Sequence, residues 1–388
     1  MNAGFLLWPW RRGAEVVRPR GSRRTADQNW FPGWGGQELC WSHLAGGWVN
    51  TGGRCLDGRR QPLPAGWVRL TSQVGGQSGG EDEEIYHAPV LAEEVIQWLN
   101  PAPGRIFVDG TFGGGGHTRR LLGQGAGVLA LDRDGDAMAE ADEVREEWPE
   151  QFAALRTTFD RFPEILEESG VPMVDGILLD IGVSSWQIDS PNRGFSFRFD
   201  GPLDMRMDRD APLTAEEIVN TWPSEDLARI FFDYGEERLA RRVAAAIVTR
   251  RAQKALTTTV ELAALVETVI PRHSGAHPGT KVFQALRIAV NDELGCLERA
   301  LAGAHRFLKP GGRLAVITFH SLEDRIVKNY MRRHAEPFID RPEWPAPRMN
   351  PECYYRLPVK KSITAGEAEL AANPRARSAR LRVAERIS

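Results

Sequence analysis

No apolar run in the sequence approaches the ~20 residues that a membrane-spanning helix requires, so no membrane-spanning segment is predicted. There are only four cysteines and none stands in Cys-x-x-Cys spacing, which argues against a disulfide scaffold and a zinc ribbon. The 49 lysines and arginines are balanced by 52 acidic residues, and this net charge of -3 excludes a polybasic protein. We therefore expect a cytoplasmic protein with no metal site, in which any nucleic-acid contact comes from local patches of charge.

The first eighty residues differ in composition from the rest of the chain. They hold sixteen of the 39 glycines and seven of the 12 tryptophans, with ten arginines, no lysine and four acidic residues. No apolar periodicity of a helix or a strand runs through them. This composition favours a disordered extension, or upstream sequence translated from a misplaced start codon, over an RNA-binding arm of arginine and tryptophan.

From Glu81 onward, short apolar segments alternate with amphipathic ones. Near-continuous apolar strands separated by helices indicate an α/β fold, with a parallel sheet covered on both faces. The alternation stops in a loop rich in proline and glycine, continues as helices, and resumes with a late strand at residues 314–319. The early strands are expected at residues 106–109, 128–132, 154–157 and 176–180. The predicted divisions are an extension (1–80), a first core segment (81–188), a helical insertion (189–290), and a second core segment with a basic C-terminal tail (291–388).

A glycine-rich loop follows the first predicted strand and opens the first predicted helix. In Val108-Asp-Gly-Thr-Phe-Gly-Gly-Gly-Gly-His117, the glycines let the backbone approach a ligand closely, and the helix N-terminus supplies free N–H groups. Asp132 ends the next strand, where a carboxylate accepts both hydroxyls of an adenosine ribose. A simple turn with a capping aspartate would leave four consecutive glycines unexplained. The pairing therefore predicts a site for an adenosine-bearing cofactor.

The same loop discriminates between cofactors. A dinucleotide fingerprint needs a third glycine where Thr118 stands, and the Gly-Lys-Ser/Thr of a P-loop is absent. Asp109 before the loop would repel a pyrophosphate but suits the ammonium group of S-adenosylmethionine. Asp180 ends the fourth strand, so Asp109, Asp132 and Asp180 are expected to converge at the carboxyl edge of the sheet. Electrostatics therefore favour S-adenosylmethionine over NAD.

Several sequence motifs, most of them five to ten residues long, are spread over most of the chain. They include Asp109-Gly-Thr-Phe-Gly-Gly-Gly-Gly-His117 and Gly176-Ile-Leu-Leu-Asp-Ile-Gly-Val-Ser-Ser185, with others at residues 87–91, 193–197, 201–208, 234–238, 283–291, 319–325 and 373–382. In these motifs and in their order, the chain from His87 to Arg386 resembles the bacterial small-subunit ribosomal RNA cytosine-N4-methyltransferases, the RsmH/MraW family. Residues 1–80 have no counterpart in this resemblance.

The resemblance implies a class I S-adenosylmethionine-dependent methyltransferase, a Rossmann-like parallel sheet with an inserted all-helical domain that recognises the substrate. It implies N4-methylation of a cytosine in the decoding region of 16S rRNA, which is then the partner, within the small ribosomal subunit. It leaves a homodimer open. The family usually has proline where this chain has Trp186, a difference in the loop over the cofactor. Carried over by position, the cofactor contacts are Gly115, Gly116, His117, Asp132, Phe159, Asp180 and Gln187.

The acceptor chemistry calls for one more group. The N4 amine of cytosine is a poor nucleophile because its lone pair is conjugated into the ring, so a catalyst must accept an N–H hydrogen bond and orient the amine. Asp180 is the predicted acceptor, with a hydroxyl of Ser184 or Ser185 as the alternative. His320 follows the late strand, and either contacts the target base or is hydrogen-bonded within its loop. The alternating phenylalanines at 195, 197 and 199 either stack an unpaired base or pack at a strand period.

Two groups of basic residues are candidates for RNA phosphate contacts, and a solvated surface is the alternative for each. They are Arg238, Arg241, Arg242, Arg250, Arg251 and Lys254 on one predicted helix, and Arg375, Arg377, Arg380 and Arg382 in the C-terminal tail. Three other functions compete with the rRNA methyltransferase: an NAD-dependent oxidoreductase, a non-catalytic ribosome assembly factor that retains a cofactor pocket, and the same chemistry on DNA or a small amine.

Overall fold

The computed structural model describes residues 89–388, except residues 273, 274 and 276, together with the backbone of four short strands in the preceding segment. Those strands form two antiparallel pairs, β1 (Ser42–Leu44) with β2 (Gly47–Val49) and β3 (Arg54–Leu56) with β4 (Arg59–Gln61). The sequence did not predict these pairs, because a three-residue strand is too short for an alternating pattern to show. Otherwise the predicted disordered extension at residues 1–80 lies outside the described residues.

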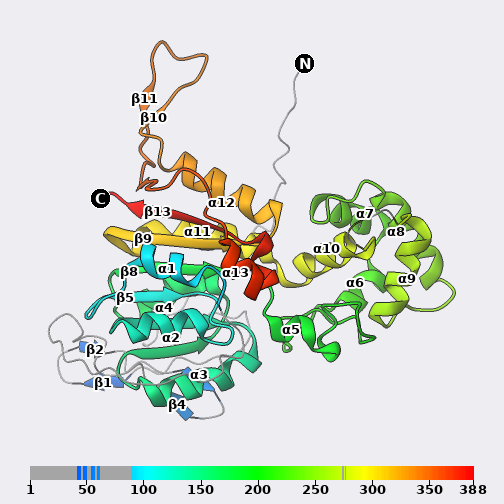
Figure 1. Ribbon diagram of the computed structural model, residues 1–388, viewed down its shortest axis with the longest axis horizontal. Helices are drawn as coiled ribbons and strands as arrows, with labels where there is room; N and C mark the ends of the chain where they lie inside the picture. The colour runs from blue at the N-terminus through cyan, green and yellow to red at the C-terminus, as the bar shows by residue number, and fades with distance from the viewer. Residues whose placement is uncertain are drawn as a thin grey trace, which may run out of the picture. The chain divides into compact units, whose positions relative to one another are not determined.

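A seven-stranded sheet organises the chain from residue 89 onward, in the order β12–β13–β9–β8–β5–β6–β7 (Figure 1). Neighbouring strands pair in parallel from β9 to β7, whereas β13 runs antiparallel to both β9 and β12. The predicted α/β fold with a Rossmann-like parallel sheet is confirmed. The strands are β5 (Ile106–Asp109), β6 (Gly127–Asp132), β7 (Phe152–Arg156), β8 (Val174–Asp180), β9 (Leu308–Thr318), β12 (Tyr355–Arg356) and β13 (Arg380–Arg386).

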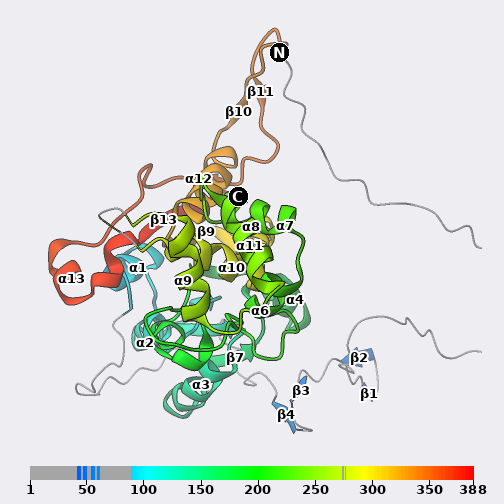
Figure 2. The same cartoon turned by 90° about the vertical axis from the view of Figure 1, so that its right-hand side faces the viewer.

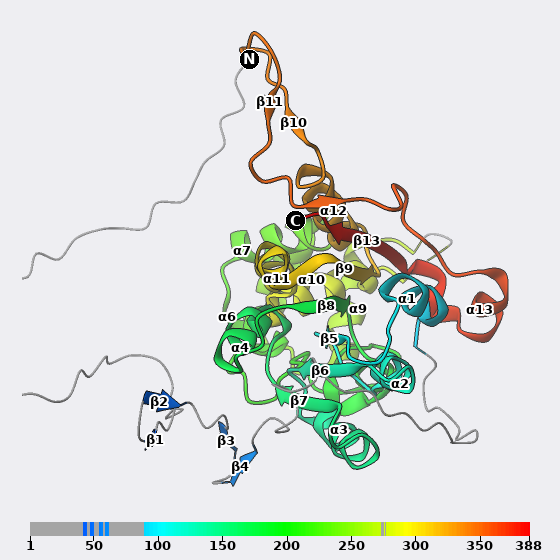
Figure 3. The same ribbon diagram turned by 90° about the vertical axis from the view of Figure 1, so that its left-hand side faces the viewer.

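Helices cover both faces of the sheet, and alternate strand residues serve the two faces (Figure 3). In β5, Val108 packs into one hydrophobic cluster and Phe107 into the other, as expected for strands buried on both sides. One cluster includes α1 (Ala92–Leu99), α2 (Gly116–Gly123) and α3 (Gly135–Glu147). The other includes α4 (Phe162–Glu168), α11 (Glu293–Phe307) and α12 (Ser321–Arg333).

The chain between β8 and α11 leaves the sheet and builds a helical region with its own hydrophobic cluster (Figure 2). Its helices are α6 (Ala215–Thr221), α7 (Ser224–Asp233), α8 (Ala240–Arg251), α9 (Thr259–Val269) and α10 (Gly279–Asn291). Thr258 caps α9 by accepting a hydrogen bond from the backbone N–H of Glu261, as the sequence predicts. The exact domain limits at residues 188 and 290 stay predictions.

The remaining described elements are short. They are α5 (Ser185–Asp189), α13 (Glu367–Ala372), the hairpin strands β10 (Phe338–Ile339) and β11 (Arg348–Met349), and the 3-10 turns at Phe159–Arg161, Pro191–Arg193 and Pro374–Ser378. Within the part of the chain that the structure describes, no helix is both long enough and apolar enough to cross a membrane.

A core substitution in the insertion tests whether its hydrophobic cluster acts by itself. Leu286 on α10 is completely buried in that cluster, so Leu286→Ala is expected to lower the free energy of unfolding by about 2–5 kcal/mol. Hydrogen exchange should show lost protection in α6–α10 and retained protection in the sheet. Leu179→Ala, in the buried strand β8, is the matched change in the core. If Leu286→Ala lowers protection equally in α6–α10 and in the sheet, the cluster of the insertion does not act independently of the core.

Candidate functional site

A cleft of about 3160 Å³ lies at the carboxyl ends of the parallel strands. Successive strands β5, β6 and β7 proceed in one direction across the sheet, whereas β8 and β9 lie on the other side of β5. Ligands of open α/β sheets bind at such a reversal of strand order. Six of the seven predicted cofactor residues line the cleft: Gly116, His117, Asp132, Phe159, Asp180 and Gln187. The seventh, Gly115, does not line it.

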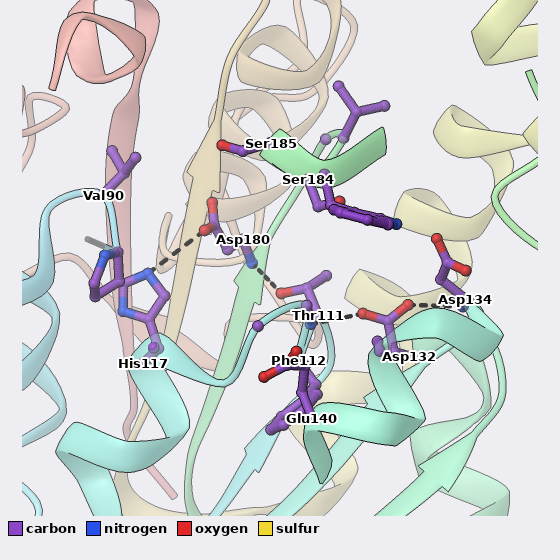
Figure 4. Close-up of a pocket in the computed structure, with 18 of the residues that line it drawn as sticks. Val90, Thr111, Phe112, His117, Asp132, Asp134, Glu140, Asp180, Ser184 and Ser185 are labelled. Carbon is purple, nitrogen blue, oxygen red and sulfur yellow. Dashed lines mark hydrogen bonds and ion pairs between the residues drawn. The ribbon is translucent and has the colours of Figure 1, made fainter. Parts of the chain in front are cut away.

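Gly115 acts on the shape of the loop. It adopts φ of +75° at the N-cap of α2, a conformation that favours glycine, and an added Cβ would lie 2.9 Å from the ring of Phe112. Gly113 also has a positive φ, and its backbone N–H donates to Asp132 Oδ2 at 2.7 Å (Figure 4). The glycines thus turn the backbone so that α2 begins at the cleft.

Asp109 plays a different part from the one that the sequence suggested. Its carboxylate is buried and accepts hydrogen bonds from Thr111 N at 3.1 Å and from Thr118 Oγ1 at 2.7 Å. Burial raises the pKa of Asp109, and its side chain does not line the cleft. Asp109 therefore holds the glycine-rich loop against α2, and the expectation that it faces the ammonium group of the cofactor is corrected.

Asp132 stands at the end of β6, as predicted from its place after an apolar strand. Its Oδ2 accepts from Gly113 N and its Oδ1 accepts from Asp134 N at 2.8 Å. Burial raises the pKa of Asp132 to about 6, while these two backbone N–H groups act in the opposite direction. Each carboxylate oxygen retains a free lone pair, so the pair of oxygens suits two vicinal hydroxyls of a ribose.

His117 and Asp180 form a pair across the cleft, with 3.5 Å between His117 Nε2 and Asp180 Oδ2 (Figure 4). Thr111 Oγ1 positions Asp180 by accepting a hydrogen bond from its backbone N–H at 2.7 Å. Both imidazole nitrogens and Asp180 Oδ1 are buried and have no hydrogen-bond partner among the described residues. Because buried polar atoms are normally bonded, these groups fit a site that is completed by a polar ligand.

Gln187 is oriented by the protein at both ends of its amide. Its Oε1 accepts from Ser184 N at 3.0 Å, and its Nε2 donates to Asp134 Oδ2 at 2.7 Å. Ser184 in turn caps α5 through its hydroxyl. Trp186, the residue that differs from the family pattern, is about half exposed, and its indole Nε1 donates to Asp136 at 3.2 Å. The wall of the cleft around Gln187 is thus fixed against the start of α3.

The sequence analysis missed a buried arginine that supports this wall. Arg193 is almost completely buried, and its guanidinium contacts Asp134 Oδ2 at 2.9 Å and Asp136 Oδ2 at 2.7 Å. The same side chain donates to the carbonyl oxygens of Arg206 and Met207, each at 3.0 Å. The sequence held one sign that Arg193 matters, because Arg193 is the first residue of a motif, residues 193–197, that resembles the family. Nothing in the sequence identified the acidic partners of Arg193.

His320 does not line the cleft. It caps α12, where its Nδ1 accepts from Glu323 N at 3.3 Å and its Nε2 lies 2.9 Å from Glu323 Oε1. Glu293 lies close enough that these three residues could surround a cation, but Arg287 already donates to both oxygens of Glu293, at 2.8 and 2.9 Å. The geometry thus favours the hydrogen-bonded alternative for His320 over direct contact with the reacting amine.

The phenylalanines at 195, 197 and 199 do not form a strand, because the loop that carries them follows an irregular path. Phe197 packs against His277 and Phe283, with ring centroids 4.4 and 4.8 Å apart. Phe199 is exposed. The period-two packing alternative is therefore wrong, and Phe197 serves as a packing residue of the insertion.

Comparisons with known proteins find chains that are similar to this one over most of its length. The model of the MraW methylase family matches residues 84–387. "Ribosomal RNA small subunit methyltransferase H" from Rhodospirillum centenum is 52% identical over 318 residues, which are 81% of this chain and 96% of that protein. The protein of the same name from Carboxydothermus hydrogenoformans is 46% identical over 79% of this chain and 99% of its own length. Among solved structures, an rRNA methylase from Streptococcus thermophilus aligns with a TM-score of 0.32 and 10% identity, over 76% of this chain and 94% of that one.

The affinity for S-adenosylhomocysteine should depend on the ionisation of Asp132. Burial raises the pKa of Asp132 in the free protein to about 6, and ribose hydroxyls favour the carboxylate, so binding lowers that pKa. The affinity should therefore fall as the pH drops through about 6, by up to about tenfold per pH unit. Titration calorimetry between about pH 5 and 7.5 measures it. Asp132→Asn should bind more weakly and show a flat profile, and an equally steep profile in that variant would assign the dependence to another group.

The buried ion pairs of Arg193 should be needed for stability. Arg193→Met leaves the buried carboxylate of Asp134 without its cation, so we expect the free energy of unfolding to fall by about 3–5 kcal/mol in urea denaturation. Arg198→Met, at an exposed position in the same loop, is the control and should change stability by less than about 0.5 kcal/mol. Similar values for the two variants would show that the ion pairs contribute little.

Proposed function

This chain belongs to the MraW methylase family, and we propose that it methylates N4 of a cytosine in the decoding region of 16S rRNA within the small ribosomal subunit. The cofactor of the family is S-adenosylmethionine, which supplies an activated methyl group when bound. The observation that carries the proposal is the His117–Asp180 pair, in which both imidazole nitrogens and Asp180 Oδ1 are buried without a hydrogen-bond partner among the described residues. The pair lies beside the glycine-rich loop and Asp132, at the reversal of strand order. A cytoplasmic location follows from this substrate.

The residues of the cleft divide the binding of the cofactor among them. The N-terminus of α2, at Gly116 and His117, presents backbone N–H groups and a helix dipole that suit a carboxylate. Asp132 accepts the ribose hydroxyls. Gln187 and Phe159, which both line the cleft, bound the space between these two groups. The donor set therefore fits a ligand that carries an amino-acid end and a ribose.

Asp180 is the group best placed to act on the acceptor amine. Its Oδ1 has no hydrogen-bond partner among the described residues, while its backbone is held by Thr111. The alternative hydroxyl of Ser184 already accepts the hydrogen bond that caps α5. Asp180 therefore accepts a hydrogen bond from an N–H of the amine, which holds the lone pair of the amine nitrogen toward the methyl group. Asp180 then takes the proton that the methylated nitrogen releases.

The rival functions explain the site less well. An NAD-dependent oxidoreductase would share the sheet and the ribose acid, but this chain belongs to a methylase family. A non-catalytic assembly factor would not need Asp180 to be kept in place by Thr111 with one oxygen unpartnered. A small amine as substrate would leave the helical insertion without a purpose.

The proposal predicts the product and the effect of one substitution. Purified protein, S-adenosylmethionine and small subunits from a strain lacking this gene should yield N4-methylcytidine, detected by mass spectrometry of digested rRNA. Asp180→Asn should lower kcat by about 100- to 10,000-fold, because the amide cannot take the proton. Ser185→Ala is the control for the same loop and should retain turnover. Normal turnover in Asp180→Asn would refute the role of Asp180, and bound cofactor without methylated rRNA would refute the proposed substrate.

A further inference from the structure

A second, smaller hollow of about 450 Å³ adjoins the cofactor cleft. The two share Phe319, Arg377 and Ser378 as lining residues, so the hollow meets the cleft at these residues. Its walls are α12, which includes Lys328, and the segment that enters β13. We call this hollow the α12 groove.

Three cations of the α12 groove are exposed and free of ion pairs within the described chain: Lys328, Arg377 and Arg380. The acidic groups beside them are already engaged. Asp324 accepts two hydrogen bonds from Arg382, at 2.6 and 3.0 Å. Glu236 of the insertion accepts hydrogen bonds from two residues that line the groove, Arg325 at 2.9 Å and Ser321 at 3.0 Å. The charge that the groove offers to a ligand is therefore positive.

Of the other basic residues that the sequence put forward, Arg238, Arg241 and Arg242 are exposed but line neither the cleft nor the α12 groove, and several of the rest are engaged by the protein itself. Arg375 pairs with Asp189 at 2.7 Å. Arg251 donates to the carbonyl oxygens of Val219 and Trp222, and Lys254 pairs with Glu261. Such contacts consume the donors that a phosphate would need. Among the C-terminal arginines, only Arg377 and Arg380 combine exposure, freedom from ion pairs and a place beside the cleft.

We infer that the α12 groove binds consecutive phosphates of the RNA strand that flanks the target cytosine. The inference rests on the proposed function, since it takes the base in the cleft to be part of an RNA chain. A strand whose base enters the cleft must leave it along a neighbouring surface, and this groove adjoins the cleft at three shared lining residues. Cations on two separate elements suit an extended polyanion better than one compact anion. Phosphate contacts of this kind fix the register of the strand without reading its sequence.

The test removes the three cations together. The variant Lys328→Gln/Arg377→Gln/Arg380→Gln, loaded with S-adenosylhomocysteine, is compared with the wild type for binding to unmethylated small ribosomal subunits over a series of KCl concentrations. Each lost phosphate contact should reduce the slope of log affinity against log salt by about 0.7, so the slope should fall by about 2. At low salt the affinity should fall about tenfold or more, and KM should rise more than kcat falls.

A matched control separates the groove from net charge. Arg145→Gln/Arg306→Gln/Arg348→Gln also removes three positive charges, at positions that line neither the cleft nor the groove. It should leave the salt slope within about 0.5 of the wild type. Equal effects of both variants, or an unchanged slope in the groove variant, would overturn the inference. Methyl transfer by the wild type shows whether the proposed function itself stands, so the two can fail separately.

Discussion

A buried guanidinium, that of Arg193, joins the start of α3 to the loop that leads into the helical insertion. A charge taken out of water must be paired, and Arg193 meets that requirement with two carboxylates at the start of α3 and two carbonyl oxygens of the loop at residues 206–207. The loop around residues 206–207 forms no helix or strand that would fix its path. Its path past the cleft therefore depends on where Asp134 and Asp136 lie, and these follow directly from the end of strand β6.

The turn after β6 accordingly serves several purposes with consecutive residues. Asp132 lines the cleft, Arg133 donates to the carbonyl oxygen of Asn291, and Asp134 accepts a hydrogen bond from Gln187 and pairs with Arg193. Asn291 continues the connection, because its side chain donates to Met205 O and accepts from Met207 N. The insertion is thus held against the turn after β6, which lines the cleft. Methyl transfer requires close alignment of donor and acceptor, so this connection bears on the rate as well as on stability.

The parts of the site that could be predicted from sequence are those governed by local rules. Asp132 and Asp180 follow apolar strands, and parallel strands bring such residues to one edge of a sheet. Arg193 could not be predicted, because its partner Asp136 lies 57 residues away and no periodicity links them. Asp109 occupies the same kind of strand end as Asp132, yet the hydroxyl of Thr118 turns it inward. The role of a strand-end acid thus depends on its neighbours in space.

The basic residues of the C-terminal segment show the same dependence on neighbours. Arg380 and Arg382 are two residues apart on β13 and so project from the same face, where α12 offers Asp324. Arg382 takes both oxygens of that carboxylate, which leaves Arg380 unpaired beside Lys328 and Arg377. A sequence that reads as a uniform basic tail therefore separates into two ion pairs, Arg375 with Asp189 and Arg382 with Asp324, and a remainder of free positive charge. The positions of two acidic residues, Asp189 on α5 and Asp324 on α12, decide which arginines support the fold and which are left for a polyanion.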